Sequence, residues 1–168
     1  MGILRPLLIT LFAVCCAEAQ AADACFGRTP LEAAEAFYRE HKDFSLKDPK
    51  KLQGHVTMSF YEALAFEYKC KVGEICAVDF DLWTGAQDGD IQKPISFHLA
   101  STNDNRAVVT MRYTFALDRS RRKAQSAKIL VERETQNECW VVADVVSPDG
   151  ISTVRIIEEF RAKYGRQL

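Results

Sequence analysis

The sequence predicts an α+β protein, with N-terminal helices packed on a curved four-stranded antiparallel sheet and a C-terminal helix. Two segments before residue 75 carry apolar residues at helical spacing. Four later segments alternate apolar and polar residues or are apolar throughout, and short turns separate them. Helices packed against an antiparallel sheet form a layered α+β architecture, so we expect a single domain of this class.

The N-terminal helices are predicted from their ends as well as from their apolar spacing. Thr29 is a capping residue, Pro30 suits the first helical position, and Glu32 completes a capping box. This first helix is expected to end by Asp48, which precedes a proline. A second amphipathic helix is predicted over residues 57–71.

The second half of the chain predicts a meander of four strands. The strand-like segments are 95–100, 109–117, 127–131 and 139–146. Polar turns between them favour antiparallel neighbours, and the last segment is apolar on both faces, which is typical of a buried strand. Ser152 then caps a last helix, in which Val154, Ile157 and Phe160 are expected to face the core.

Residues 1–21 have the pattern of a cleavable secretory signal peptide. Arg5 precedes an uncharged apolar run over 7–16, and Ala19 and Ala21 fit the small-residue pattern before a cleavage site. We therefore expect cleavage after Ala21 and a mature domain over 22–168, located in the periplasm or secreted. An N-terminal membrane anchor is disfavoured because ten apolar residues are far fewer than the roughly 20 that span a bilayer.

Acylation of Cys15 or Cys16 is a second alternative for the N-terminus. The residues before these cysteines match a lipoprotein signal poorly. No later segment is apolar enough to span a membrane, so after cleavage the chain is not expected to cross one.

Four cysteines follow the predicted cleavage site, and an even number in an oxidising compartment predicts two disulfides. They are Cys25, Cys70, Cys76 and Cys139. Four cysteines allow three pairings. We favour a local bond between Cys70 and Cys76, which leaves Cys25 to pair with Cys139 across a much longer loop.

Charge and motifs restrict the class of partner. Lys and Arg total 22 and Asp and Glu total 23, a net charge of −1, which argues against a nucleic-acid-binding protein. The sequence has no zinc-ligand spacing, phosphate loop or dinucleotide fingerprint, so we expect neither a metal nor another cofactor. His41 and His55 are isolated in the sequence and are expected to be structural.

The segment from residue 75 to 93 lacks clean periodicity and is the best candidate for a binding site. A long irregular segment in a compact domain is commonly functional. Its predicted binding residues are Asp79, Asp81, Trp83, Gln87 and Asp88. The carboxylates could instead hold calcium, although the spacing is not that of an EF-hand, or they could cap turns within the loop.

Asp144 and His98 are the weaker candidates for catalysis. Alternation along the last strand places Asp144 on one face with Trp140 and Val142, where burial would raise its pKa and suit a general base. His98 points away from its apolar neighbours and could assist if the two strands faced each other. Otherwise Asp144 is paired with a basic side chain or with backbone donors.

Three stretches of the chain resemble a bacterial exported family known as domain of unknown function 3828. They are Phe37-Tyr38, the run from Asp79 to Asp88 ending in Gln-Asp, and Trp140 to Val145 with Asp149-Gly150 and a closing helix. The family is similar to the cystatin-like and nuclear-transport-factor-2-like superfamily, in which a curved sheet wraps around a helix. The resemblance implies a fold and an exported location but no reaction.

These observations favour a non-enzymatic exported domain that binds a small ligand or a periplasmic protein. The concave face of the sheet and the acidic segment are the expected binding surface. The alternative is a small pocket enzyme of the isomerase or hydrolase type, with Asp144 and His98 as acid and base.

Overall fold

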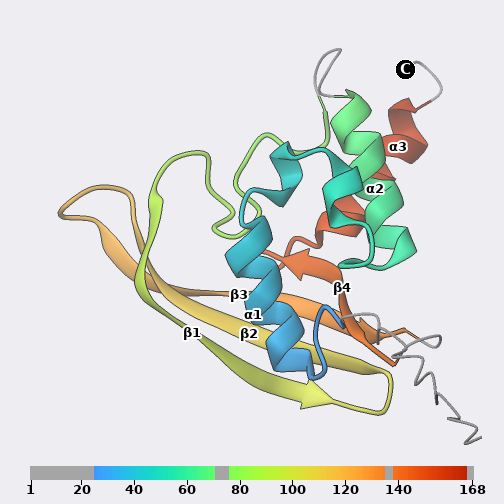
Figure 1. Ribbon diagram of the computed structural model, residues 1–168. Coiled ribbons are helices and arrows are strands. Elements are labelled where there is room, and N and C mark those ends of the chain that lie inside the picture. The colour runs from blue at the N-terminus through green and yellow to red at the C-terminus, as the bar shows by residue number, and fades with distance from the viewer. Residues whose placement is uncertain (1–24, 71–75, 135–137, 166–168) are drawn as a thin grey trace, which may run out of the picture.

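The computed structural model describes residues 25–70, 76–134 and 138–165 (Figure 1). Four antiparallel strands form one sheet in the order β1-β2-β3-β4. The elements are α1 (Pro30–His41), two short 3-10 helices at Phe44–Leu46 and Pro49–Leu52, α2 (Met58–Cys70), β1 (Asp90–Thr102), β2 (Arg106–Ala116), β3 (Arg122–Arg133), β4 (Trp140–Val146) and α3 (Thr153–Tyr164). The predicted α+β class, with N-terminal helices and a C-terminal helix on a four-stranded sheet, is confirmed.

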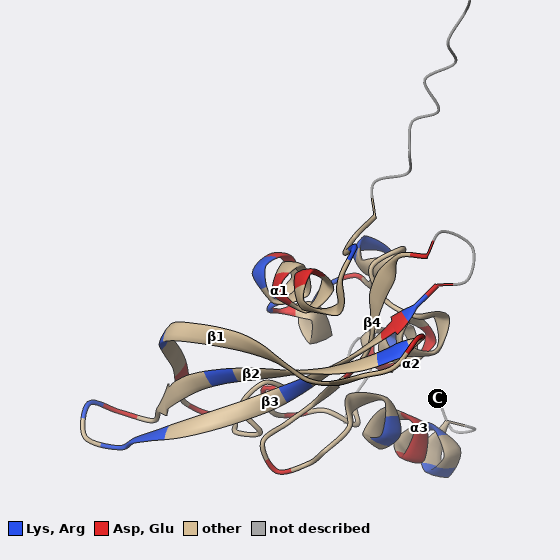
Figure 2. Ribbon diagram, turned by 90° about the horizontal axis from the view of Figure 1, so that it is seen from below, with Lys and Arg blue, Asp and Glu red and all other residues tan. Residues whose placement is uncertain are grey.

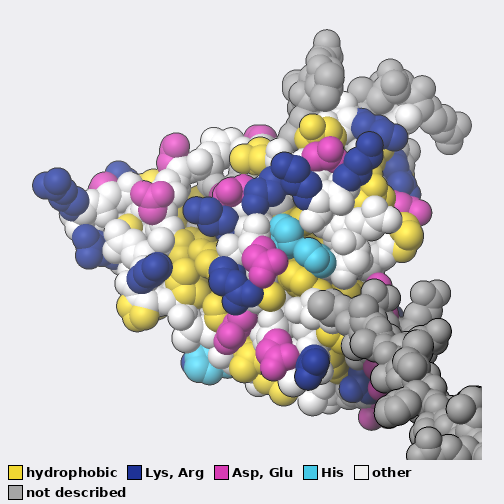
Figure 3. Space-filling view, in the orientation of Figure 1, with side chains coloured by type: hydrophobic (Ala, Val, Ile, Leu, Met, Phe, Trp, Pro, Cys, Tyr) yellow, Lys and Arg dark blue, Asp and Glu magenta, His cyan; other side chains and the backbone are white. Residues whose placement is uncertain are grey.

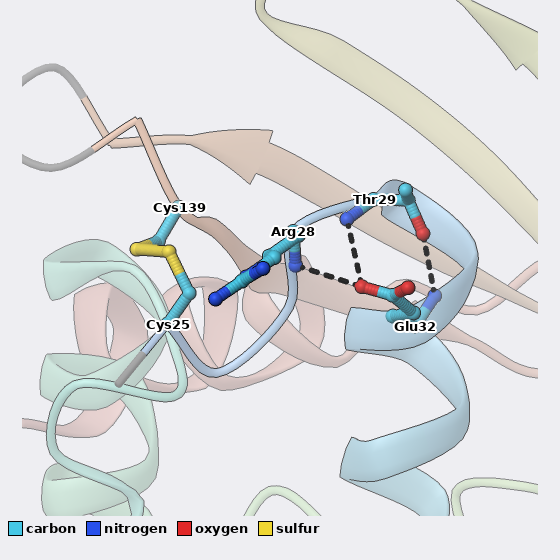
Figure 4. The surroundings of a disulfide bond; sticks show 5 residues. All are labelled: Cys25, Arg28, Thr29, Glu32 and Cys139. Carbon is cyan, nitrogen blue, oxygen red and sulfur yellow. Dashed lines mark hydrogen bonds between the residues drawn. A yellow bond between two sulfur atoms is a disulfide. The ribbon is translucent and has the colours of Figure 1, made fainter. Parts of the chain in front are cut away.

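Helix α1 begins with the predicted capping box. The Glu32 backbone N–H donates to Thr29 Oγ1 at 3.2 Å, and the Glu32 carboxylate accepts from the backbone N–H groups of Thr29 and Arg28 (Figure 4). These bonds satisfy donors that a helix start leaves unpaired. The helix ends at His41, earlier than the sequence predicts, and a 3-10 turn carries Phe44 back into the core.

One face of the sheet and helix α1 together form the core. Alternate residues of β2 and β3, among them Met111 and Ile129, are fully buried on this face, and Phe37 of α1 packs among them. Figures 1 and 2 show α1 lying across the sheet, with α3 on the opposite side. The sheet face that we expected to bind a ligand is therefore covered by α1 and is part of the core.

Strand β4 contains an irregularity that changes which side its residues face. Leu130 of β3 pairs with Asp144, whereas the next residue, Val131, pairs with Val142. The extra residue reverses the alternation, as a β-bulge does. Val142 lies on the core face, and Asp144 lies on the outer face, next to the start of α3.

The outer edge of β4 is paired by two segments from the N-terminal half of the chain. The Trp140 N–H donates to the Gly27 carbonyl at 2.8 Å. The Val142 N–H donates to the His55 carbonyl at 3.0 Å, and the Thr57 N–H donates to the Val142 carbonyl at 2.8 Å. This edge of the sheet therefore has few unpaired backbone groups left.

Strand β1 forms the other edge and is long but irregular. Its register with β2 shifts between Gln92 and Ser96 and again between Leu99 and Ser101. Pro94 lies inside the first irregular stretch and has no backbone N–H to donate. The edge strand begins at Asp90, within the segment that the sequence predicted to be irregular.

The described residues contain two disulfides, one local and one between distant parts of the chain, and both match the favoured pairing. Cys25 is bonded to Cys139, just before β4 (Figure 4). Cys70 is bonded to Cys76, at the end of α2. None of the helices in the described part of the chain is long and apolar enough to cross a bilayer. The predicted signal peptide, including Cys15, Cys16 and Ala21, lies outside the described residues.

Candidate functional site

The acidic segment lines a surface cleft together with the 3-10 turn that follows α1. The cleft has a volume of about 340 Å³, which is at the small end of the range for ligand sites. Its polar lining includes three carboxylates, Asp43, Asp79 and Asp81, and one cation, Lys42. Its apolar lining comes from Phe44, Leu46, Val78, Phe80, Leu82 and Trp83.

Buried Glu67 of α2 holds the start of the acidic segment in place. Its carboxylate accepts from the backbone N–H groups of Ala77 and Val78, each at 3.1 Å. The disulfide between Cys70 and Cys76 fixes the same stretch to the end of α2. The wall of the cleft is thus attached to the core at its first residues, which reduces the ordering that binding would require.

Asp81 organises the turn that forms the floor of the cleft. Its Oδ1 accepts from the Trp83 N–H at 3.0 Å and from the Thr84 N–H at 2.8 Å. Its backbone pairs with Ala86, and Gly85 closes the turn at a φ of 68°, a conformation that favours glycine. This is the structural use of a carboxylate that the sequence left open, although the Asp81 side chain also lines the cleft.

Two further predicted binding residues lie at the rim. The Gln87 side-chain amide donates to Asp79 Oδ2 at 3.2 Å, and both side chains line the cleft and are exposed. Asp88 is exposed but is not among the residues that line the cleft. The structure therefore brings Asp79, Asp81 and Gln87 together and leaves Asp88 outside.

Trp83 belongs mainly to the core rather than to the binding surface. Its side chain is 2% exposed, and its Nε1–H donates to the Lys42 carbonyl at 2.7 Å. Its ring lies edge-on to Tyr38, with the centroids 5.1 Å apart, and contacts Phe37 and Phe44. The indole fixes the 3-10 turn against the acidic segment, so it shapes the cleft from behind.

The cleft has a negative potential that acts on the tyrosines beneath it. Burial raises the pKa of Tyr38, and the charges of Asp81 and Asp43 raise it further. Burial likewise raises the pKa of Tyr113, and Asp81 adds to the effect. Carboxylates that disfavour a phenolate in this way favour a cation at the same place.

The suggested acid–base pair of Asp144 and His98 does not form. His98 is exposed on β1, where its Nε2 lies 3.1 Å from Ser96 Oγ, and Asp144 lies on β4 at the opposite edge of the sheet. Three strand spacings separate the two residues, which is about 14 Å. The bulge in β4 also removes Asp144 from the face of Trp140 and Val142, where the sequence had placed it.

Asp144 caps the start of α3 instead. Its Oδ1 accepts from the Val145 N–H at 2.8 Å and from the Val154 N–H at 3.1 Å, and its Oδ2 accepts from the Ser152 hydroxyl. Burial raises the pKa of Asp144, and these hydrogen bonds oppose the rise. All the contacts are structural, and a negative charge at a helix N-terminus is favourable.

Two substitutions of Asp144 separate its role as an acceptor from its charge. Asp144→Ala leaves the Val145 and Val154 N–H groups unpaired and is expected to lower the free energy of unfolding by about 2–4 kcal/mol in urea titrations. Asp144→Asn keeps an acceptor and is expected to change it by less than about 1 kcal/mol. Equal losses in the two variants at pH 7 would show that the charge, rather than the acceptor, stabilises α3.

The contribution of Asp144 to folding stability should change with pH in a defined direction. The folded protein holds the Asp144 proton to a higher pH than the unfolded chain does, because the folded pKa is raised. The contribution of this carboxyl to stability is therefore full below its unfolded pKa and declines as the pH rises through the folded pKa. As the pH rises from the unfolded pKa of Asp144 to its folded pKa, the wild type should therefore lose stability relative to Asp144→Asn.

The structure brings together two histidines that the sequence treated as isolated. His41 Nε2 lies 2.7 Å from His55 Nδ1, and the Glu40 carboxylate is nearby. Among the described residues, these three form the group of His, Cys, Asp and Glu side chains close enough to share a metal ion. The two histidines are 14 residues apart, unlike the short His-x3–5-His spacing of common zinc motifs, so the fold rather than the sequence reveals the group.

The fold and the cleft together define a small disulfide-bonded α+β domain with an acidic surface site. Comparisons with protein-family models, curated proteins and solved structures gave no match to this chain. The resemblance to domain of unknown function 3828 stays a prediction.

Proposed function

We propose that this protein is an exported, non-enzymatic binding domain that holds a small organic cation in its acidic cleft. The observation that carries the proposal is the cleft itself, with three carboxylates and one lysine at its polar surface and six apolar side chains beside them. The basic side chain of a periplasmic protein could present the same chemistry. The signal peptide predicted in residues 1–21 and the two disulfides support a location outside the cytosol.

The chemistry of the cleft indicates a ligand with a cationic end and an apolar body. Leu46 is 71% exposed at the cleft, so an apolar surface is available there without unfolding any element. A primary ammonium group could be hydrogen-bonded by Asp43 or Asp79, both of which are exposed. The Asp144 carboxylate is already hydrogen-bonded by β4 and by the start of α3, which argues against its use as a general base.

Phenethylamine and phenylacetate test the sign of the charge with the same ring. We expect phenethylamine, but not phenylacetate, to shift backbone amide NMR signals of residues 43–46 and 79–87 in the purified, oxidised protein. The shifts should weaken with added salt, since the carboxylates are exposed and screened. Equal binding of both compounds, or shifts confined to other elements, would contradict the proposal.

Matched variants test the carboxylates. The double variant Asp43→Asn/Asp79→Asn is expected to weaken phenethylamine binding by roughly two- to thirtyfold, because it removes two exposed charge interactions, each worth about 0.2–1 kcal/mol. The control is Asp104→Asn, which removes an exposed carboxylate from the turn between β1 and β2. The control variant should bind phenethylamine as the wild type does.

A further inference from the structure

The imidazole rings of His41 and His55 meet through one nitrogen of each ring, beside the Glu40 carboxylate. His41 Nε2 and His55 Nδ1 are 2.7 Å apart, and one ligand atom from each of Glu40, His41 and His55 lies within 4.8 Å of the other two. Figure 3 shows histidine side chains side by side near the middle of one face of the molecule, next to acidic and basic side chains. The group is thus accessible from solvent on one side.

Backbone structure fixes both histidines independently of any ligand. His41 is the last residue of α1, and Glu40 precedes it. The His55 N–H donates to the Leu52 carbonyl at 2.9 Å, and the His55 carbonyl accepts from the Val142 N–H of β4 at 3.0 Å. A helix end and a strand edge therefore set the distance between the two rings.

Aromatic packing fixes the orientation of the rings. The Phe26 ring stacks on His55 with a centroid distance of 4.0 Å and an interplanar angle of 15°. The centroids of the Phe37 and His41 rings are 5.5 Å apart, and His41 is only 7% exposed. Phe26 follows Cys25, whose disulfide to Cys139 ties this part of the chain to the start of β4. Rings held in this way have little rotamer freedom left to lose on binding.

The environment favours the neutral form of both rings. Burial is the main cause that lowers the pKa of His41, and the neighbouring His55 and Lys47 lower it further. Burial also lowers the pKa of His55. The Glu40 charge acts against this lowering of the pKa in both rings.

We propose that Glu40, His41 and His55 bind one Zn²⁺ ion, with solvent completing its coordination. Two imidazole nitrogens and a carboxylate oxygen are a ligand set that zinc uses in proteins, and three protein ligands leave one position for water. The ion takes the place of the hydrogen shared by the two rings. The ring that had donated this hydrogen carries it on its other nitrogen once the ion is bound, so both rings stay neutral.

The distances require only a small adjustment. Tetrahedral zinc with bonds of about 2.0–2.1 Å to nitrogen needs its ligand atoms about 3.3 Å apart. The nitrogens are 2.7 Å apart and must separate by about 0.6 Å, and the Glu40 ligand oxygen, which lies within 4.8 Å, must approach to the same spacing. Exposed Glu40 and partly exposed His55 can supply this movement by side-chain rotation, while buried His41 stays in place.

Two cations, Arg39 and Lys47, lie beside the proposed ligand Glu40. Glu40 Oε1 accepts from Arg39 Nη2 at 2.8 Å, but both side chains are exposed, and the second oxygen of the carboxylate is a further acceptor. Lys47 Nζ donates to the Glu40 backbone carbonyl at 3.0 Å and not to its carboxylate. These cations reduce the affinity for a divalent ion without blocking the ligand atoms.

Calorimetric titration of Zn²⁺ into the oxidised protein tests the proposal. The protein carries no histidine tag and is first treated with a chelator, which is then removed. We expect saturable binding of one ion per chain, and ¹⁵N shifts of the His41 and His55 rings that report bonding at Nε2 and Nδ1. Absence of saturable binding up to millimolar Zn²⁺ would overturn the proposal and leave a hydrogen-bonded histidine pair only.

Three variants assign the ligands. His41→Gln and Glu40→Gln are each expected to weaken Zn²⁺ binding at least about tenfold, since even outer partners of a metal site contribute 10–100-fold. His98→Gln removes an exposed histidine of β1 and should leave the affinity unchanged. Glu40 is exposed, so its variant should fold even if His41→Gln does not. Undiminished binding in Glu40→Gln, or a loss in His98→Gln equal to that in Glu40→Gln, would overturn the assignment.

The zinc site and the acidic cleft can be tested independently. Glu40, His41 and His55 are not among the residues that line the cleft. Glu40→Gln should therefore bind phenethylamine normally, and the Asp43→Asn/Asp79→Asn variant should bind Zn²⁺ normally. Failure of either proposal leaves the other standing.

Discussion

Replacing Cys25 and Cys139 together by serine is expected to lower the free energy of unfolding by about 5 kcal/mol. The two cysteines are 114 residues apart in sequence, and chain-entropy estimates give nearly this value for a loop of that length. The total stability of a domain is commonly about 5–15 kcal/mol, so the variant should lose a large share of it. Urea denaturation followed by tryptophan fluorescence measures the change.

The second disulfide provides the matched control. Cys70 and Cys76 are only 6 residues apart, and the same estimate gives about 2 kcal/mol for their replacement by serine. Losses of equal size in the two variants would mean that the disulfides do not act mainly through loop closure. A local effect of the Cys70 variant should appear as altered NMR signals at Ala77 and Val78, which Glu67 holds next to this bond.

Trp83→Ala is expected to lower the free energy of unfolding by about 3–5 kcal/mol. The indole is 2% exposed and lies among Phe37, Tyr38 and Phe44, so its removal leaves a large cavity. It also removes the hydrogen bond to the Lys42 carbonyl, which fixes the 3-10 turn after α1. Thermal and urea denaturation should both detect the loss.

Trp83→Phe separates a core role from a binding role. This variant keeps an aromatic ring but loses the Nε1–H donor to the Lys42 carbonyl, and a hydrogen bond of this kind is worth about 0.5–1.5 kcal/mol. The folded variant should still bind phenethylamine, because the ring supports the cleft from behind. Wild-type stability combined with abolished amine binding would instead show direct contact with the ligand.

The sequence predicted most of the fold because its signals are local. The capping box at Thr29 and Glu32 and the alternation along β2 depend on neighbouring residues only, and both are confirmed. Helix α1 ended earlier than predicted because Phe44 returns to the core through a 3-10 turn rather than by helical continuation. The favoured cysteine pairing also matches the structure. Cys70 and Cys76 are close in sequence and were expected to pair, which left Cys139 as the partner of Cys25.

The candidate site was less predictable because it depends on contacts between distant residues. One extra residue in β4 places Asp144 on the outer face, and strict alternation along the strand could not reveal it. Trp83 was selected for its position in an irregular segment, but Phe37 and Phe44 bury it. The contact between His41 and His55 exists only because the segment after the second 3-10 helix pairs with β4.

The two edges of the sheet differ in a way that bears on association between molecules. A second chain approaching β4 meets backbone groups already bonded to Gly27, His55 and Thr57, so it finds little to pair with. At β1 it meets Pro94 and two shifts of register, which break the row of donors that strand addition needs. Extension of the sheet from one molecule to the next is therefore opposed at both ends, which protects a long, partly apolar edge strand from aggregation.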